Sequence, residues 1–449
     1  MSIERIKQPG EKRTPTIRAN RHYQPAVNLN LNVRGLPESA TLEINERSAE
    51  LSRRGRHVYR LGLGQSPFPV PEPIVEKLRV NAHQKDYLPV KGLPTLRAAA
   101  AEYFRRTQQI DCTQEECLIG PGTKELMFIL QLVYYGDLVI PTPSWVSYAP
   151  QAHIIGRQIR WLPTRPEDEW RLTPDAIASV CKDDPNRPRI LVVNYPNNPS
   201  GVTYNIEQLR ELAREARKYR VILLSDEIYG ELDHEGRHIS IARFYPEGTI
   251  VSSGLSKWCG AGGWRLGGFL FPRSLRWLLD AMAVVASETY TSTSAPIQYA
   301  AVRAFQGGIE LEEYLAHSRR ILKSLGRSLT KMLQEAGAQV PMPEGAFYLF
   351  PDFNRSRDEL RSRNITTSAD LCNRLLDETG VAMLPGSAFG CDPNELTARI
   401  AYVDFDGSRA LAAARQVPMS QDLGRDYLDY YCSAPMEAVR RLCDWLHAS

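Results

Sequence analysis

Short apolar runs separated by helical segments occupy the middle of this chain, and they limit its possible folds more than any other feature. The runs at 137–140, 189–193 and 221–224 are mostly aliphatic, which is typical of strands buried on both faces. Residues 206–219 repeat apolar side chains at helical spacing. This alternation predicts an α/β domain whose mainly parallel sheet lies between layers of helices.

A polar or glycine-rich cluster follows each predicted strand of this sheet. The clusters are Gly120–Lys124, Pro141–Trp145, Asn194–Gly201, Asp226–Tyr229 and the stretch 252–268. Open α/β sheets bind ligands beyond the carboxyl ends of their strands. We therefore expect these clusters to meet at one site.

The segments at the two ends of the chain differ from this pattern and predict a second, smaller α+β domain built from both ends. The C-terminal part predicts a long helix at 311–336, strands at 345–350, 381–384 and 397–402, and helices at 368–379 and 436–446. We divide the chain into a basic N-terminal arm (1–25), the N-terminal part of the small domain (26–75), a large cofactor-binding domain (76–308) and the C-terminal small domain (309–449), with an irregular polar insertion near 416–432.

Composition and charge argue against several functional classes. A net charge of +3 over 449 residues does not indicate a nucleic-acid partner, and no apolar stretch is long enough to predict a membrane helix. The eight cysteines form no C-x-x-C pair, and the histidines show no metal-ligand spacing. We therefore expect a cytoplasmic, metal-free protein with reduced thiols. The basic arm is expected to be solvated or to lie on a partner subunit; a tail that binds anions or nucleic acid is the alternative.

Lys257 stands among small residues, eight positions before Arg265. A lysine becomes a useful nucleophile or base when its surroundings lower its pKa, and Schiff-base chemistry is a usual role. A plain surface charge is the structural alternative. The surrounding glycines do not form a G-x-G-x-x-G loop, because Arg265 occupies the third glycine position after Gly260 and Gly262.

The groups at the strand ends match the needs of one cofactor. A phosphate would bind at the N-terminus of the helix that is predicted to start at Glu125, after Gly122-Thr123-Lys124, with Arg265 as a second, charged ligand. Trp145 offers a flat face for a ring, and a buried Asp226 needs a cationic or hydrogen-bonding partner. Lys257 offers a covalent attachment point. A phosphate, a pyridine ring that must be protonated and an aldehyde together describe pyridoxal 5'-phosphate.

Taken together, the motifs resemble those of the class I/II aminotransferases, the fold-type I pyridoxal-phosphate enzymes, and most closely the aspartate aminotransferase-like members. The resemblance runs from about Pro37 to about Val403. The motifs that carry it are Tyr87-x-x-x-x-Gly92, Gly122-Thr-Lys124, Pro143-Ser-Trp145, Asn198-Pro-Ser-Gly201, Asp226-Glu-Ile-Tyr229, Ser256-Lys257 and Gly263-Trp-Arg265-x-Gly267.

The resemblance implies roles around the cofactor ring. Lys257 would bond the aldehyde and later carry a proton from the substrate. Asp226 would keep the ring nitrogen protonated, and Asn198 and Tyr229 would bond the phenolic oxygen. Trp145 would stack on the ring. Packing alone is the structural alternative for Trp145 and Tyr229.

The resemblance also implies a phosphate site made by Gly122, Thr123, Ser256 and Arg265, with Lys124 beside it. Many family members carry a serine three residues before the lysine as a phosphate ligand, but Gly254 stands at that position here. We expect Ser256 or Ser253 to take its place.

Substrate and partner roles follow from the same resemblance. Arg399 would hold the substrate α-carboxylate through a bidentate pair, and Gly64 would leave room for it, with Trp145 and Asn198 also lining the substrate site. A structural ion pair is the alternative for Arg399. Tyr87 would reach the phosphate of a neighbouring subunit, which implies a homodimer with shared active sites.

The expected reaction is transfer of an amino group from an L-amino acid to a 2-oxo acid such as 2-oxoglutarate. Ser39, Thr41 and Lys124 stand where an aspartate-specific subgroup contacts the distal carboxylate, although Ser39 and Thr41 equally suit a helix cap. Elimination, cyclisation or oxidation in a biosynthetic pathway is the alternative reaction. A cofactor-sensing DNA-binding regulator is disfavoured, because the N-terminal arm is too short and too polar for a winged helix.

Overall fold

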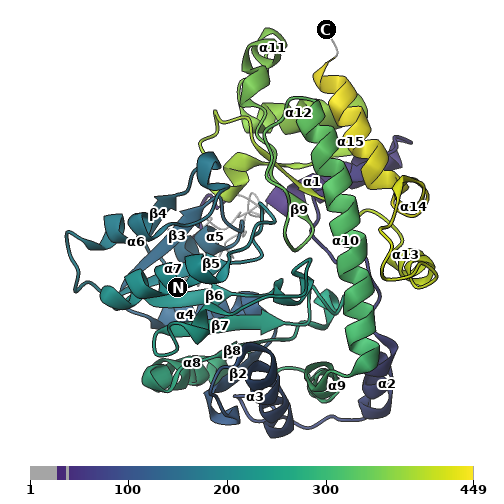
Figure 1. The fold of residues 1–449 in the computed structure, drawn as a ribbon. Coiled ribbons are helices and arrows are strands. Elements are labelled where there is room, and N and C mark those ends of the chain that lie inside the picture. The colour runs from purple at the N-terminus through teal and green to yellow at the C-terminus, as the bar shows by residue number, and fades with distance from the viewer. Residues whose placement is uncertain (1–27, 37–39, 448–449) are drawn as a thin grey trace, which may run out of the picture.

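The computed structural model of the protein describes residues 28–36 and 40–447 (Figure 1). The predicted basic arm at 1–25 and Ser39 therefore lie outside the described residues. For Thr41 only the backbone is described, in the first turn of helix α1 (Ala40–Arg53).

A seven-stranded sheet forms the centre of the large domain, with the strand order β2-β8-β7-β6-β5-β3-β4. Only β8 runs against its neighbours, so the predicted mainly parallel sheet is confirmed. The strands are β2 (Cys117–Gly120), β3 (Asp137–Thr142), β4 (Ile159–Pro163), β5 (Arg189–Asn194), β6 (Ile222–Asp226), β7 (Thr249–Gly254) and β8 (Gly267–Leu270).

Helices cover both faces of this sheet because alternate strand residues point to opposite sides. Leu224 and its neighbours on one face pack in a core with α4 (Thr123–Val133) and α8 (Arg276–Thr289). Leu223 and its neighbours on the other face pack with α6 (Pro174–Cys181) and α7 (Ile206–Lys218). Full burial of one such leucine contributes about 2 kcal/mol.

Local sequence explains where two of the helices begin. Asn205 caps α7 by accepting from the Gln208 N–H, and the Gln208 side chain accepts from the Asn205 N–H in return. Helix α3 (Pro94–Gln108) begins at a proline, because proline suits the first helical position and needs no N–H partner.

The small domain joins the two chain ends, as predicted. Strand β1 (Tyr59–Arg60) pairs in parallel with β10 (Val381–Ala382). A three-stranded antiparallel sheet has the order β11-β12-β9. Its strands are shorter than predicted, namely β9 (Tyr348–Leu349), β11 (Leu384–Pro385) and β12 (Ala398–Ala401). In Figure 1 the long helix α10 (Ile309–Glu335) runs from the α9 side of the large domain to the small-domain helices α12 (Ser368–Thr379) and α15 (Ser433–Leu446).

The stretch 416–432 is not irregular throughout, which corrects the prediction. It contains helix α14 (Arg425–Tyr431), anchored by the buried side chain of Leu428. The guanidinium of Arg320 on α10 donates to backbone carbonyls of the preceding turn, including Val417 and Pro418 at 2.9 Å. A single buried leucine in a polar segment is too weak a pattern to predict a helix from sequence.

Further helices complete the two domains. Helix α9 (Ala295–Gln306) packs against α3 and against α2 (Glu72–Asn81). The short helices are α5 (Tyr148–Ile154), α11 (Arg357–Ser362) and α13 (Gly407–Ala414).

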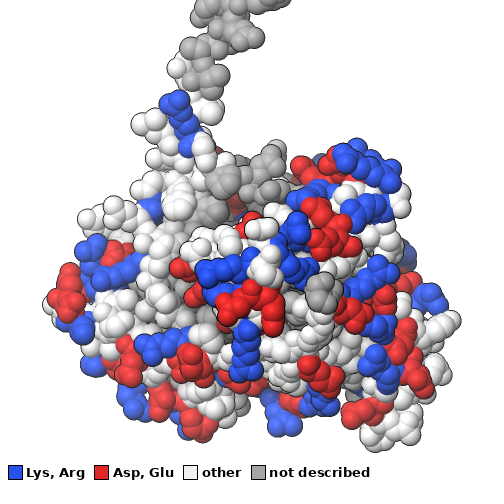
Figure 2. Space-filling model, turned by 90° about the horizontal axis from the view of Figure 1, so that it is seen from above, with Lys and Arg blue, Asp and Glu red and all other residues white. Residues whose placement is uncertain are grey.

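Charged groups of both signs mix on the face shown in Figure 2. Elsewhere in the described chain, charged side chains form exposed ion pairs within a helix, such as Arg276 with Asp280 and Arg425 with Asp429. Exposed pairs of this kind contribute little to stability. Within the ranges that the structure describes, no helix is both long and apolar enough to cross a membrane.

Candidate active site

The clusters at the strand ends meet around one cavity of about 600 Å³, as the sequence predicted. Ten of the predicted site residues line it: Gly64, Thr123, Lys124, Trp145, Asn198, Asp226, Tyr229, Ser256, Lys257 and Arg265. The cavity therefore lies beyond the carboxyl ends of the parallel strands, where α/β sheets bind ligands.

Asp226, the last residue of β6, is 4% exposed and extends a carboxylate into the cavity. Tyr148 donates to its Oδ2 at 2.6 Å, and Ser252 donates to Oδ1 at 3.3 Å. Burial raises the pKa of Asp226 to about 6, against the opposing effect of these hydrogen bonds. A carboxylate with neutral partners only is well suited to hold a cationic ligand group.

Lys257 follows β7 and places its amino group over the cavity. Its Nζ donates to the Gly64 carbonyl at 2.8 Å and lies 5.6 Å from the centre of the Tyr229 ring. Burial, aided by the positive charge of Arg399, lowers the pKa of Lys257 to about 8. The lysine is therefore closer to the neutral, nucleophilic form at physiological pH than a surface lysine is.

An anion-binding cradle forms where α4 begins. The helix starts at Thr123, two residues earlier than predicted, so its free N–H groups border the cavity. A side-chain carbon at Gly267 would lie 2.6 Å from the Thr123 nitrogen, and one at Gly122 would lie 2.3 Å from Arg265 Nη2. Within the described residues, Arg265 donates only to two backbone carbonyls, those of Gly262 and Pro121. Backbone N–H groups and a guanidinium without a carboxylate partner in the described chain fit a phosphate.

The structure explains the glycine at position 254. A side-chain carbon there would lie 2.9 Å from the Leu266 carbonyl oxygen and 3.0 Å from the Gly267 Cα on the adjacent strand. Any side chain would therefore separate β7 from β8. Ser256 lines the cavity instead, and Ser253 does not.

Trp145 and Lys124 form another wall. The Lys124 Nζ lies 5.2 Å from the centre of the Trp145 ring. Burial lowers the pKa of Lys124, and the nearby charge of Arg265 adds to this effect. Trp145 also packs edge-on against Tyr148, with 5.2 Å between ring centres. The aromatic wall and the ammonium group together suit a planar ligand that carries negative charge.

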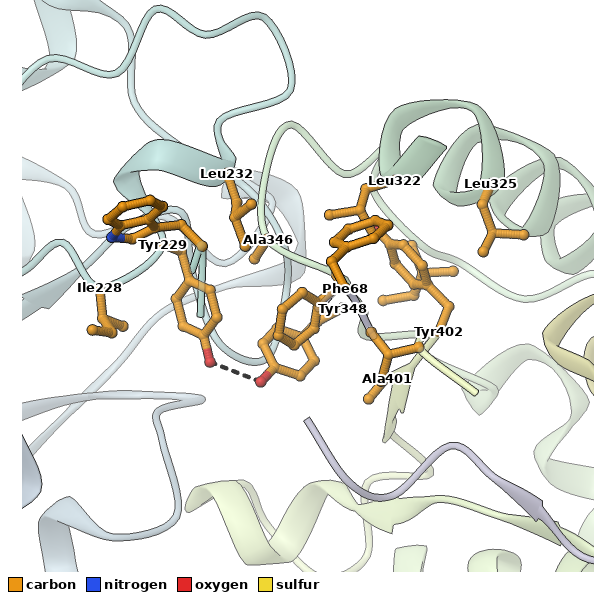
Figure 3. Packing of buried hydrophobic residues seen from close by; sticks show 14 of the residues in the cluster. Phe68, Ile228, Tyr229, Leu232, Leu322, Leu325, Ala346, Tyr348, Ala401 and Tyr402 are labelled. Atoms are coloured by element: carbon orange, nitrogen blue, oxygen red, sulfur yellow. Dashed lines mark hydrogen bonds between the residues drawn. The ribbon is translucent and has the colours of Figure 1, made fainter. Parts of the chain in front are cut away.

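Asn198 and Tyr229 both carry polar groups at the cavity surface. The Asn198 carboxamide oxygen accepts from Arg399 Nη1 at 3.1 Å, so its NH₂ group remains for a ligand. The Tyr229 hydroxyl lies 2.7 Å from the hydroxyl of Tyr348. Figure 3 marks this hydrogen bond with a dashed line. Burial raises the pKa of Tyr229 well above its ordinary value, so this phenol stays protonated.

Arg399 lies behind the cavity wall rather than on it, on strand β12 of the small domain. It is 3% exposed, donates to the Gly62 carbonyl at 2.5 Å, and lies between the rings of Tyr348 (4.8 Å) and Phe389 (5.0 Å). Its Nε has no partner, and no carboxylate of the described residues forms an ion pair with it. A buried guanidinium in this state calls for an anionic ligand.

Two predicted residues have other surroundings than expected. At Gly64 a side-chain carbon would lie 2.1 Å from the Tyr348 hydroxyl, so the missing side chain leaves room for another part of the protein, and its role toward a substrate stays a prediction. Tyr87 lies outside the cavity and is 89% exposed. Its predicted role toward a neighbouring subunit stays a prediction.

The charges of the site show whether the expected cofactor would fit there. Four cationic side chains lie in or beside the cavity, Lys124, Lys257, Arg265 and Arg399, against the one carboxylate of Asp226. The cation excess fits a phosphate-bearing cofactor together with a carboxylate substrate, and Asp226 fits a protonated ring nitrogen.

Sequence analysis missed several residues that complete the site. Asn194 holds the Asp226 carbonyl with its Nδ2 at 2.8 Å and accepts from the Asn198 N–H. Asn194 is the last residue of β5 and begins one of the predicted clusters, but no role was predicted for it. Tyr148 and Tyr348 gave no signal, because their partners lie far away along the chain.

Comparison with known proteins finds similar chains over most of this sequence. Residues 56–414 match the family model described as aminotransferase class I and II. The chain is 32% identical to an aspartate aminotransferase of Geobacillus stearothermophilus, over 81% of this chain and 92% of that protein. It is 33% identical to an aspartate/prephenate aminotransferase of Thermus thermophilus, over 80% and 91%. A solved structure of Thermus thermophilus aspartate aminotransferase with maleate aligns with a TM-score of 0.79 at 28% identity, over 93% and 99% of the two chains.

Proposed function

The chain belongs to the class I and II aminotransferases, and on that premise we propose that it binds pyridoxal 5'-phosphate in this cavity and transfers the amino group of L-aspartate, or a similar acidic amino acid, to a 2-oxo acid such as 2-oxoglutarate. The observation that carries the proposal is the charge pattern of the site. One carboxylate, that of Asp226, forms no ion pair, and four cations lack carboxylate partners among the described side chains.

The residues around the ring position support the amino-transfer chemistry. When bound, the cofactor supplies a protonated pyridine ring that accepts electrons from the substrate. The Asp226 carboxylate would hold the proton on the ring nitrogen. The amino group of Lys257 would bond the cofactor aldehyde and, once free, accept the proton from the substrate Cα. The lowered pKa of Lys257 favours both tasks, since each needs the neutral amine.

The cradle residues would hold the phosphate. The N–H groups at Thr123, the hydroxyl of Ser256 and the guanidinium of Arg265 border the same end of the cavity. Trp145 would cover the ring face, and the amide NH₂ of Asn198 and the hydroxyl of Tyr229 would donate to the phenolic oxygen.

The proposed preference for substrates with two carboxylates rests on two cations, one buried behind the cavity wall and one lining the cavity. Arg399 would bind the α-carboxylate from behind Asn198. Lys124 would meet a second, distal carboxylate near Trp145, because no acidic side chain of the described residues pairs with it. Ser39 and the Thr41 side chain, which lie outside the described part, remain predicted partners of that distal group.

We further propose that the enzyme is a homodimer in the cytoplasm with shared active sites. The exposed Tyr87 ring supports this arrangement, since it is free to reach a second copy. A large exposed aromatic side chain is typical of interfaces.

A screen of amino donors with 2-oxoglutarate tests the proposal, with Lys257→Ala as the blank. We expect aspartate to convert bound pyridoxal phosphate to pyridoxamine phosphate faster than alanine or aromatic amino acids do, and the blank to lose at least about 1,000-fold in turnover. Much faster turnover of alanine or aromatic donors would refute the acidic preference. Release of ammonia without pyridoxamine phosphate would indicate elimination instead of transfer.

A second variant isolates the distal cation. Lys124→Met keeps the length of the side chain but removes its charge. We expect KM for aspartate to rise about tenfold while KM for alanine stays unchanged. An equal change for both donors would contradict the role of Lys124.

A further inference from the structure

Tyr348 connects the two halves of the site and has no role assigned so far. It lies on β9 of the small domain and is 1% exposed. Its hydroxyl lies 2.7 Å from the Tyr229 hydroxyl of the large domain, and the guanidinium carbon of Arg399 lies 4.8 Å from the centre of its ring. Figure 3 shows the two phenols pointing toward one another. One side chain thus contacts a residue at each of two binding positions.

The direction of the hydrogen bond between the phenols follows from their surroundings. Tyr229 lines the cavity, whereas the hydroxyl of Tyr348 has no second partner in the described part of the protein. If Tyr229 donated, the Tyr348 proton would be buried without an acceptor, which is costly. If Tyr348 donates, both protons are usable: one bonds Tyr229 and the other faces the cavity.

The charge of Arg399 favours the same direction. Burial raises the pKa of Tyr348, but the guanidinium opposes this rise. Burial raises the pKa of Tyr229 well above its ordinary value, and the neighbouring phenol raises it further; Arg399 opposes this rise too, but it interacts more strongly with Tyr348. The phenol nearer to the cation is the stronger acid and therefore the better donor.

We propose that Tyr348 is a positioning residue with two roles. Its hydroxyl donates a hydrogen bond to the Tyr229 hydroxyl, so that Tyr229 can donate its own hydrogen bond to the cofactor oxygen. Its ring holds the guanidinium of Arg399 in place for the substrate carboxylate. Gly64 is needed for this position of Tyr348, because only a residue without a side chain leaves space for the Tyr348 hydroxyl. The inference rests on the proposed function.

The first test is Tyr348→Phe, which removes the hydroxyl and keeps the ring. Affinity of the apoenzyme for pyridoxal phosphate should fall about threefold, and the pH midpoint of the bound cofactor's absorbance should rise by about half a unit, because Tyr229 becomes a weaker donor. KM for the amino donor should stay near that of the wild type. Tyr402→Phe is the matched control, since its buried hydroxyl has no partner among the described residues, and it should change neither quantity.

The second test is Tyr348→Leu, which also removes the ring beneath Arg399. KM for the amino donor should rise about tenfold above that of Tyr348→Phe, with no further change in the absorbance midpoint. Thermal unfolding of both variants checks that they fold.

Two results would overturn the inference. One is a Tyr348→Phe protein that matches Tyr402→Phe in cofactor affinity and absorbance midpoint. The other is a Tyr348→Phe protein whose donor KM rises as much as that of Tyr348→Leu. Cofactor affinity is measured without any donor, so a wrong donor assignment leaves this test intact. A wild-type apoenzyme that binds no pyridoxal phosphate would overturn the proposed function and this inference together.

Discussion

Asp226 and Glu227 are consecutive carboxylates at the end of β6, equally buried at 4% exposure, and their surroundings are opposite. Asp226 faces the cavity with two hydroxyl donors, Tyr148 and Ser252. Glu227 does not line the cavity, and protein groups contact both of its carboxylate oxygens. Its Oε1 accepts from Ser225 and Ser240 at 2.7 Å and from Tyr195 at 3.3 Å, and its Oε2 lies 2.8 Å from His238 Nε2.

The difference shows how burial alone fails to distinguish function from structure. A buried carboxylate whose partners are all supplied by the protein stabilises the fold around it. A buried carboxylate beside a cavity, with a pKa raised to about 6, costs stability and has capacity left for a ligand. We therefore expect opposite effects from mutating these two adjacent residues: loss of turnover at Asp226 and loss of stability at Glu227.

The largest expected effect comes from Asp226→Asn, which tests the functional side of this comparison. The amide cannot hold a proton on the cofactor ring, so turnover of the holoenzyme should fall by about 100- to 1,000-fold. Steady-state kinetics with aspartate and 2-oxoglutarate measures this. Turnover within a few-fold of the wild type would mean that Asp226 does not act on the cofactor.

The Asp226→Asn substitution should also raise the free energy of unfolding of the apoprotein. The folded pKa of about 6 lies above the unfolded value of 3.8, so the folded state binds more protons between these values and loses stability as pH rises through that window. At pH 8 the asparagine variant should therefore be more stable by up to about 3 kcal/mol. Urea unfolding of both apoproteins at pH 4 and pH 8 measures this, and the gain should vanish at pH 4. A gain that is equal at both pH values would contradict the assigned cause.

Glu227→Gln comes next and should act in the opposite direction. The amide NH₂ group replaces an acceptor that several buried donors share, so the free energy of unfolding should fall by about 2 kcal/mol. Turnover per folded molecule should stay within about threefold of the wild type, because Glu227 does not line the cavity. Denaturant unfolding and active-site titration separate the two quantities. A large loss of turnover without a loss of stability would remove the contrast with Asp226.

Tyr148→Phe should have the smallest effect and sharpens the account of Asp226. It removes the 2.6 Å hydrogen bond that favours the charged carboxylate, so the pKa of Asp226 should rise further. Turnover near pH 7 should fall about tenfold and recover partly at higher pH. A pH–rate profile measures this, and a profile that falls uniformly at every pH would point to a steric cause.

Much of the site was predictable because its signals are local. Strands β3, β5 and β6 are continuous apolar runs, and the parallel sheet brings the residues after them to one edge. Lys257, Asp226 and the start of α4 therefore met as expected. The helix at 425–431 was not predicted, because its only strong signal is one leucine.

The less predictable contacts all join distant segments. Tyr348 lies 119 residues from Tyr229, and Arg399 lies 337 residues from the Gly62 carbonyl that it binds. Nothing in the sequence near Gly64 indicates that its missing side chain makes room for a tyrosine hydroxyl. Such contacts depend on how the small domain docks on the large one.

The sequence by itself determined the α/β fold, the edge of the sheet where the site lies and the residue types that carry its chemistry, because strand and helix patterns are local and parallel strands end on the same side. Only the tertiary structure decided which buried polar groups are satisfied. Asp226 and Glu227 look alike in the sequence, and they differ because hydrogen bonds are completed by groups far away along the chain.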